Sequence, residues 1–149
     1  MPLRLALLQT KLKFMIKKTI FIFSVAGLLF AGYLSSVKFF SGSCALGESC
    51  PYFLGYPACY FGFIMYASLT ILSGLMLWKK LPPMRSLSGI SIVSFLGILF
   101  AGYFTVQELP VLFEQGLSAY VLGLPTCALG LIFYITIFKL SIFARFKKK

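Results

Sequence analysis

Residues Ser43–Tyr66 read SCALGESCPYFLGYPACYFGFIMY, a polar cysteine-rich loop that runs into a long apolar segment. The second part of this stretch recurs, because Phe53–Tyr66 and Val121–Tyr134 are identical at seven of 14 positions. A shorter match precedes each copy, where Phe30–Tyr33 and Phe100–Tyr103 both read FAGY. The order of these matches predicts two tandem units of the same orientation, a parallel repeat.

Composition places the repeat in a lipid environment. The chain has 149 residues, of which 60% are hydrophobic and 11% charged, and a soluble domain does not carry this balance. A helix needs roughly 20 apolar residues to cross a bilayer. Segments of about that length lie at Thr19–Phe40, Phe53–Trp78, Ser88–Val106 and Tyr120–Phe138. We expect one all-α membrane domain, a four-helix transmembrane bundle with repeats at about 19–78 and 88–142.

The first residues of the chain mix leucines with basic side chains. Residues 3–18 read LRLALLQTKLKFMIKK, a pattern typical of a helix that lies in the membrane interface with its lysines reaching toward water. A cleavable signal peptide is the competing interpretation. We favour the interfacial helix, because the apolar segment that follows has a partner later in the chain.

Charge predicts the orientation in the membrane. The chain has 14 Lys and Arg residues against 3 acidic ones, and every cation except Lys38 lies in the N-terminal segment, in Lys79–Arg85 or near the C-terminus. The three acids, Glu48, Glu108 and Glu114, fall in the connectors at about 41–52 and 107–119. The positive-inside rule then puts both termini in the cytoplasm and the cysteine loop outside. Charges spaced between apolar runs also argue against nucleic-acid binding.

Cysteine is the main reactive residue type. Because the chain has no histidine, imidazole metal sites and histidine-based catalysis are excluded. Cys44 and Cys50 lie in the outer loop, and Cys59 and Cys127 lie near the outer ends of their spans, on the side where disulfides persist. The loop pair, Cys44 and Cys50, is either redox-active or a structural disulfide that holds the loop. The other two either form a second pair across the repeat or pack between helices. The spacing matches no zinc pattern, so we predict no metal.

A family resemblance can be stated from these motifs. The C-x5-C loop, followed by Gly55, Pro57 and Gly62 at the start of the second span, resembles the bacterial vitamin K epoxide reductase family. The expected bundle with outward cysteines also resembles the disulfide bond formation protein DsbB. The resemblance implies a thiol–disulfide oxidoreductase in a bacterial or archaeal cell membrane. Its loop pair, Cys44 and Cys50, would take electrons from a thioredoxin-fold partner.

In that group a second pair, C-x-x-C, passes the electrons to a bound quinone. Here Cys127 matches the second cysteine of that motif, but Leu124 stands at the first. Either Cys59 supplies the missing partner across the repeat, or the quinone-reducing centre is absent. For quinone binding by ring stacking, the candidates are the tyrosines expected near the outer face, Tyr33, Tyr52, Tyr60, Tyr103 and Tyr120. An interfacial aromatic belt is the alternative for these tyrosines.

Two other functions remain open from the sequence. A non-catalytic scaffold or partner subunit would use its disulfides only for structure. A transporter of a small neutral solute would use the repeat, whereas ion transport is disfavoured because the expected spans contain no Asp, Glu, Arg or His.

Overall fold

The computed structural model of this chain describes residues 2–42, 52–116, 118 and 126–147. Four helices dominate these ranges: α1 (Pro2–Ser41), α2 (Ala58–Leu77), α3 (Pro83–Gln115) and α4 (Thr126–Phe146). A short antiparallel hairpin precedes α2, in which β1 (Tyr52–Phe53) pairs with β2 (Tyr56–Pro57).

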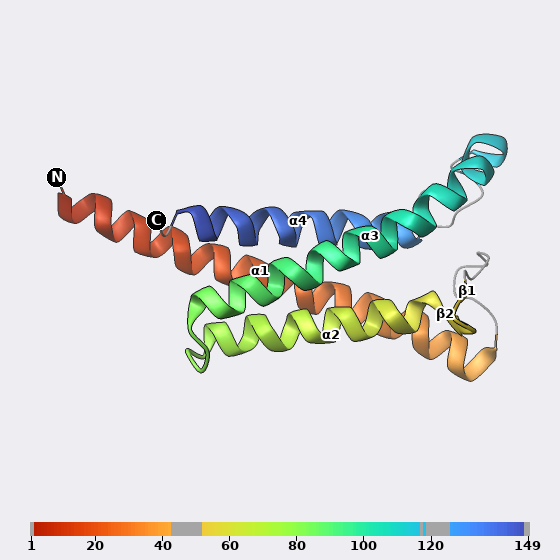
Figure 1. Ribbon diagram of the computed structural model, residues 1–149, viewed down its shortest axis with the longest axis horizontal. Coiled ribbons are helices and arrows are strands. Elements are labelled where there is room, and N and C mark those ends of the chain that lie inside the picture. Colours follow the sequence, from red (N-terminus) through yellow and green to blue (C-terminus); the bar gives the residue numbers. More distant parts are fainter. Residues whose placement is uncertain (1, 43–51, 117, 119–125, 148–149) are drawn as a thin grey trace.

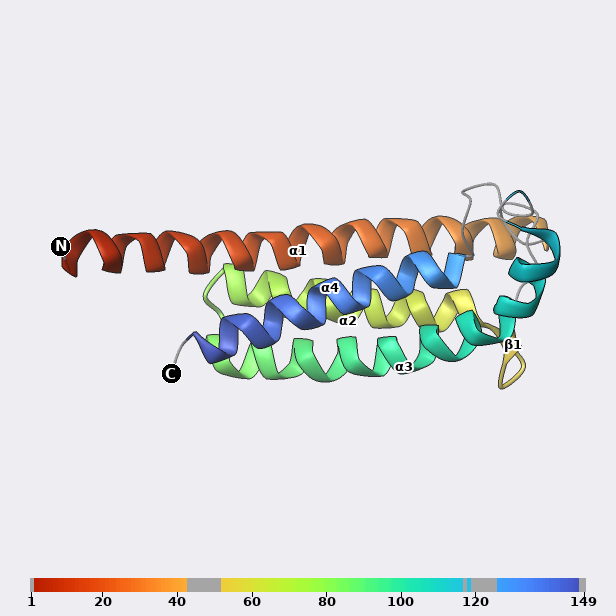
Figure 2. The ribbon, with the colours of Figure 1, turned by 90° about the horizontal axis from the view of Figure 1, so that it is seen from above.

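The helices pack side by side as a four-helix bundle (Figures 1 and 2). All four are long and apolar enough to cross a membrane, which confirms the predicted class of integral membrane protein. Both termini and the α2–α3 turn lie at one end, which we call the basic end (Figure 1). The hairpin lies at the opposite end, which we call the hairpin end.

The first helix is longer than expected. The separate interfacial helix predicted for residues 3–18 is the first part of α1, a single helix of 40 residues. Nothing interrupts it, because this segment contains neither glycine nor proline after Pro2 and is rich in good helix formers. At 1.5 Å per residue α1 is about 60 Å long. Its first buried residue is Ile16, and the turns before it project beyond the bundle at the basic end (Figure 2).

The prediction of a connector at 107–119 is wrong for residues 107–115, which belong to α3. Helix α3 continues through Pro110 and ends at Gln115, where Gly116 follows with φ 72°. A proline lacks the N–H that would bond the carbonyl four residues earlier, so it bends a helix without necessarily ending it. The last turns of α3 bend away accordingly (Figure 1). Glu108 therefore lies on a helix.

The boundaries of the other spans shift as well. Helix α2 begins at Ala58 instead of Phe53, because residues 52–57 form the hairpin. Pro57 stands directly before the helix, as its missing N–H predicts. Helix α4 is described from Thr126 and extends to Phe146, whereas Pro125 lies outside the described residues.

Buried positions follow the same order in α1 and α3. The buried positions of α1 from its middle onward are Ile20, Ser24, Gly27, Ala31 and Leu34. Those of α3 at the same intervals are Ile90, Ser94, Gly97, Ala101 and Phe104. The hydroxyls of Ser24 and Ser94 each donate to the carbonyl four residues earlier, at 2.8 Å in α1 and 2.6 Å in α3. The tandem repeat stays a prediction, but the residues it equates occupy matching environments.

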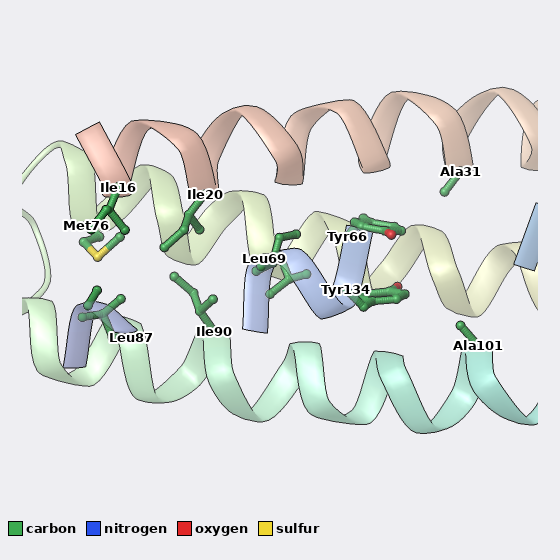
Figure 3. Close-up of a cluster of buried hydrophobic side chains, with 12 residues drawn as sticks. Ile16, Ile20, Ala31, Tyr66, Leu69, Met76, Leu87, Ile90, Ala101 and Tyr134 are labelled. Carbon is green, nitrogen blue, oxygen red and sulfur yellow. The ribbon is translucent and has the colours of Figure 1, made fainter. Parts of the chain in front are cut away.

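Two glycines let a tyrosine ring lie directly against a neighbouring helix. A Cβ on Gly27 would lie 2.2 Å from a ring carbon of Tyr66, and one on Gly97 would lie 2.4 Å from a ring carbon of Tyr134. The tyrosine rings therefore fill the space that any side chain at these positions would need. Figure 3 shows both rings in the core, between the layer of Leu69 and that of Ala31.

Candidate functional site

A cavity of about 70 Å³ lies between the two halves of the bundle, toward the hairpin end, and its lining is almost entirely apolar. From α1 and α2 it is lined by Phe30, Ala31, Leu34, Ala58, Cys59, Gly62 and Tyr66. From α3 and α4 it is lined by Phe100, Ala101, Phe104, Thr126, Cys127, Gly130 and Tyr134.

The lining is symmetric at the level of sequence. Each α1 position has its equivalent 70 residues later, and each α2 position has its equivalent 68 residues later. Five of these seven pairs are identical, and the exceptions are Leu34 with Phe104 and Ala58 with Thr126. The two segments that match between the halves of the sequence therefore meet around one cavity.

Two stacked tyrosines close the cavity toward the basic end (Figure 3). The rings of Tyr66 and Tyr134 have centroids 4.5 Å apart and are 13° from parallel. Each hydroxyl donates across the bundle, from Tyr66 to the carbonyl of Gly130 at 2.9 Å and from Tyr134 to that of Gly62 at 3.5 Å. These reciprocal bonds join α2 to α4 and hold the inner wall of the cavity in place.

The two hydroxyl bonds predict unequal mutational effects. We expect Tyr66→Phe to lower the free energy of unfolding by about 1 kcal/mol, since it removes a bond of good length between helices in an apolar setting. Tyr134→Phe removes a longer bond and should cost less. Unfolding of the two variants by SDS titration in mixed micelles measures the difference. Equal stability of Tyr66→Phe and the wild type would show that the bond contributes nothing.

The structure places Cys59 and Cys127 at equivalent points of the site. Cys59 is the second residue of α2, and Cys127 is the second residue of the described part of α4. Each is half-buried and lines the cavity. The positive end of a helix macrodipole stabilises negative charge placed there. No disulfide joins the two residues in the described part of the chain. Cys44 and Cys50 lie outside the described residues.

Of the tyrosines predicted to bind a quinone, the four that the structure describes do not line this cavity. Tyr33 and Tyr103 occupy equivalent positions on the outer surface and are each 57% exposed, and Tyr52 is exposed in the hairpin. Tyr60 lies with Tyr33 along an open groove between α1 and α2. Tyr120 lies outside the described residues.

The tyrosines that do line the cavity were missed as site residues. Tyr66 and Tyr134 are among the seven identities between the halves, and both follow a shared glycine by four residues. The match between the two halves was therefore the sequence signal that could have identified these two tyrosines as site residues. A tyrosine shared by both units and set deep in its span is more informative than one near the interface, where aromatic residues are common.

The hairpin packs over one wall of the cavity. The ring of Phe53 meets those of Phe100 and Phe104 edge to face, with centroids 5.4 and 6.3 Å away. Both of these partners line the cavity. Phe53 also contacts Phe61 of α2 at 5.3 Å, so the hairpin joins α2 to α3 at this end.

Lys38 connects the two segments that flank the cysteine loop. Its Nζ donates to the carbonyl of Gly42 at 3.1 Å and lies 5.3 Å from the centroid of the Tyr52 ring. Along the sequence, Cys44 comes two residues after Gly42, and Cys50 comes two residues before Tyr52. Gly42 and Tyr52 are therefore both held at the hairpin end of the bundle, toward which the cavity lies.

Fold and site together define an integral membrane four-helix bundle with a cysteine-lined apolar cavity between its halves. No protein-family model matches this chain, and no curated protein or solved structure is significantly similar to it. Its function is therefore argued from the chemistry of this site.

Proposed function

We propose that this protein is a membrane thiol–disulfide oxidoreductase that passes electrons from thiols to a quinone held in the cavity. The observation that carries the proposal is that Cys59 and Cys127, from different halves of the chain, line one apolar cavity. Their side chains therefore border the same apolar space. A pair that exchanges electrons with an apolar ring needs that arrangement.

The cavity suits a small ring. One water needs about 10–15 Å³ by the same measure, so about 70 Å³ admits a group several times larger. Aromatic walls from Phe30 and Phe100 can pack against a ring. The paired lining also suits a quinone head group, whose two carbonyls lie on opposite sides of the ring.

The reaction balances without a further cofactor. Two thiols lose two electrons and two protons as a disulfide bond forms between Cys59 and Cys127, and the quinone gains both to become a quinol. The bond requires the Cα atoms of the two residues to come within about 7 Å. The new disulfide is then reduced by exchange with the loop pair, Cys44 and Cys50. A thioredoxin-fold protein at the outer face supplies the electrons to this pair.

Orientation is part of the proposal. The basic end carries the termini and Lys79, Lys80 and Arg85, so the positive-inside rule assigns it to the cytoplasm. The hairpin end then faces outward, where exchange with other disulfides is chemically sustained. By the family resemblance, the membrane is the cell membrane of a bacterium or archaeon.

Thiol trapping in nanodiscs tests the proposal. The full chain is reduced with dithiothreitol, the reductant is removed, and the thiols are alkylated before and after addition of a short-chain benzoquinone. Mass spectrometry then reads each cysteine peptide. We expect the quinone to convert Cys59 and Cys127 from alkylated thiols into a linked pair. If both are alkylated to the same extent with and without quinone, the proposal is wrong. A Cys44–Cys50 bond that resists the reductant throughout would indicate a structural scaffold.

A matched pair of variants tests where the quinone binds. Ala101 is buried in the cavity wall, so Ala101→Phe should fill the space and prevent the quinone-dependent linkage. Leu99 lies on the outer face of the same helix and is 55% exposed, so Leu99→Phe should leave the linkage unchanged.

A further inference from the structure

The turn of the hairpin holds a leucine in a backbone conformation that disfavours it. Leu54 and Gly55 connect the two paired strands, with φ 53° and 85°. A type I′ turn requires positive φ at both positions, and Asn-Gly is the sequence it prefers. Leucine is unfavourable there, because its Cβ lies too close to the following carbonyl oxygen. Strained residues persist where their surroundings compensate for the strain. Leu54 is 80% exposed, so its own protein supplies little compensation.

The surface around this turn is apolar and uncharged. Residues 52–57 read YFLGYP, and Tyr52 and Tyr56 are exposed on either side of Leu54. Figure 2 shows the hairpin crossing from the start of α2 toward the side of α3, so that its turn lies at the edge of the bundle. The exposed side chains therefore face whatever surrounds the bundle at this level.

Helix α2 gives the level of the hairpin in the bilayer. It begins directly after Pro57 and has 20 residues, so it is about 30 Å long. This length equals the thickness of the hydrocarbon core. The exposed Trp78 follows the other end of α2, and tryptophan and tyrosine are enriched at both membrane–water interfaces. The hairpin and Trp78 therefore mark the two boundaries between acyl chains and lipid headgroups.

Charges on the neighbouring helices mark the same level. After Lys18, α1 has no charged residue before Lys38, whose Nζ lies 5.3 Å from the centroid of the Tyr52 ring. After Arg85, α3 has none before Glu108, one turn beyond a phenylalanine of α3 that the hairpin contacts. Charged side chains are costly within the hydrocarbon, so these residues place its boundary beside the hairpin.

We propose that the hairpin is a membrane anchor, in which Leu54 and the two flanking tyrosines insert at the boundary between headgroups and acyl chains. The leaflet is the one at the hairpin end. Lipid is the occupant of this surface, because the edge of a membrane bundle at this level borders the bilayer. The leucine enters the apolar side of the boundary, and the tyrosines keep their hydroxyls near the headgroups. Burial of Leu54 in lipid offsets the strain of its backbone. This role is independent of the thiol chemistry.

Depth-dependent quenching of fluorescence tests the anchor. Leu54→Trp is made in a Trp78→Phe background, since Trp78 is the only tryptophan of the chain. The full chain is placed in nanodiscs of phosphatidylcholine that carries bromine either near the headgroup or near the ends of the acyl chains. We expect the bromine near the headgroup to quench more strongly. Leu96→Trp in the same background is the matched control and should show the opposite order, because Leu96 is exposed midway along the uncharged stretch of α3.

Two results of this experiment would overturn the proposal. Quenching of Leu54→Trp by acrylamide in the buffer, as efficient as that of free tryptophan and without quenching by either lipid, would place the turn in water. A tryptophan that none of these quenchers reaches would be covered by protein, for example by a second copy of this chain.

Hydrogen exchange tests the anchor without the affinity of tryptophan for interfaces. Leu54→Asn supplies the residue that the turn prefers, so in water it should slow exchange of the hairpin amides. In lipid the lost burial of leucine outweighs the relief of strain, and we expect exchange in nanodiscs to become about threefold faster. Leu54→Met keeps both the apolar side chain and the strain, so it should match the wild type. Slower or unchanged exchange in Leu54→Asn would overturn the proposal.

Discussion

Replacing Gly27 or Gly97 with alanine is expected to destabilise the bundle by about 2–3 kcal/mol for each substitution, the upper part of the range for overpacked cores. The new methyl group would lie 2.2 Å from a ring carbon of Tyr66 in the first case. That ring is 2% exposed and is stacked on Tyr134. It can therefore move away only by giving up the stacking and its hydroxyl bond to Gly130.

Unfolding by SDS titration measures the effect, and Gly62→Ala is the matched control. Gly62 is also a helical glycine, but a Cβ built there meets no atom within 4 Å. Its carbonyl, which accepts the bond from Tyr134, is unchanged by the substitution. We expect Gly62→Ala to be neutral or slightly stabilising, since alanine is the better helix former. If Gly27→Ala is as stable as Gly62→Ala, the tyrosine rings are not held as tightly as the structure indicates.

The second large effect concerns catalysis. Cys59→Ser and Cys127→Ser are each expected to reduce the quinone-dependent oxidation of dithiothreitol by about 10³-fold or more, the scale on which loss of a reacting group acts. Serine is close to cysteine in size, so the fold should persist, but it cannot form the disulfide that transfers two electrons. Removing either residue should therefore be as damaging as removing both.

The rate of quinol formation, followed by absorbance in nanodiscs, measures this loss. Thr126→Ser is the matched control, because Thr126 lines the cavity beside Cys127 and carries no sulfur. It should keep a rate close to that of the wild type. A Cys127→Ser variant with the wild-type rate would show that electrons reach the quinone without the cavity pair, and would leave the loop cysteines as the donors.

Much of the architecture follows from the sequence. The number of spans depends on the length of apolar runs, which is a local property. The gathering of cations at one end follows from their sequence positions between those runs. The match between the halves also indicated that Cys59 and Cys127 occupy equivalent places, since equal sequence contexts predict equal positions in a repeat.

Only the tertiary structure decided which side chains face the interior of the bundle. A connector was expected from about residue 107, but α3 continues through Pro110 to Gln115, because a proline bends a helix without ending it when the turns on both sides persist. The rotation of each helix about its axis selects which tyrosines face inward. It is set by close packing, of Tyr66 against Gly27 and of Tyr134 against Gly97. Apolar residues surround membrane helices on every side, so hydrophobicity alone could not distinguish a cavity wall from a lipid-facing surface.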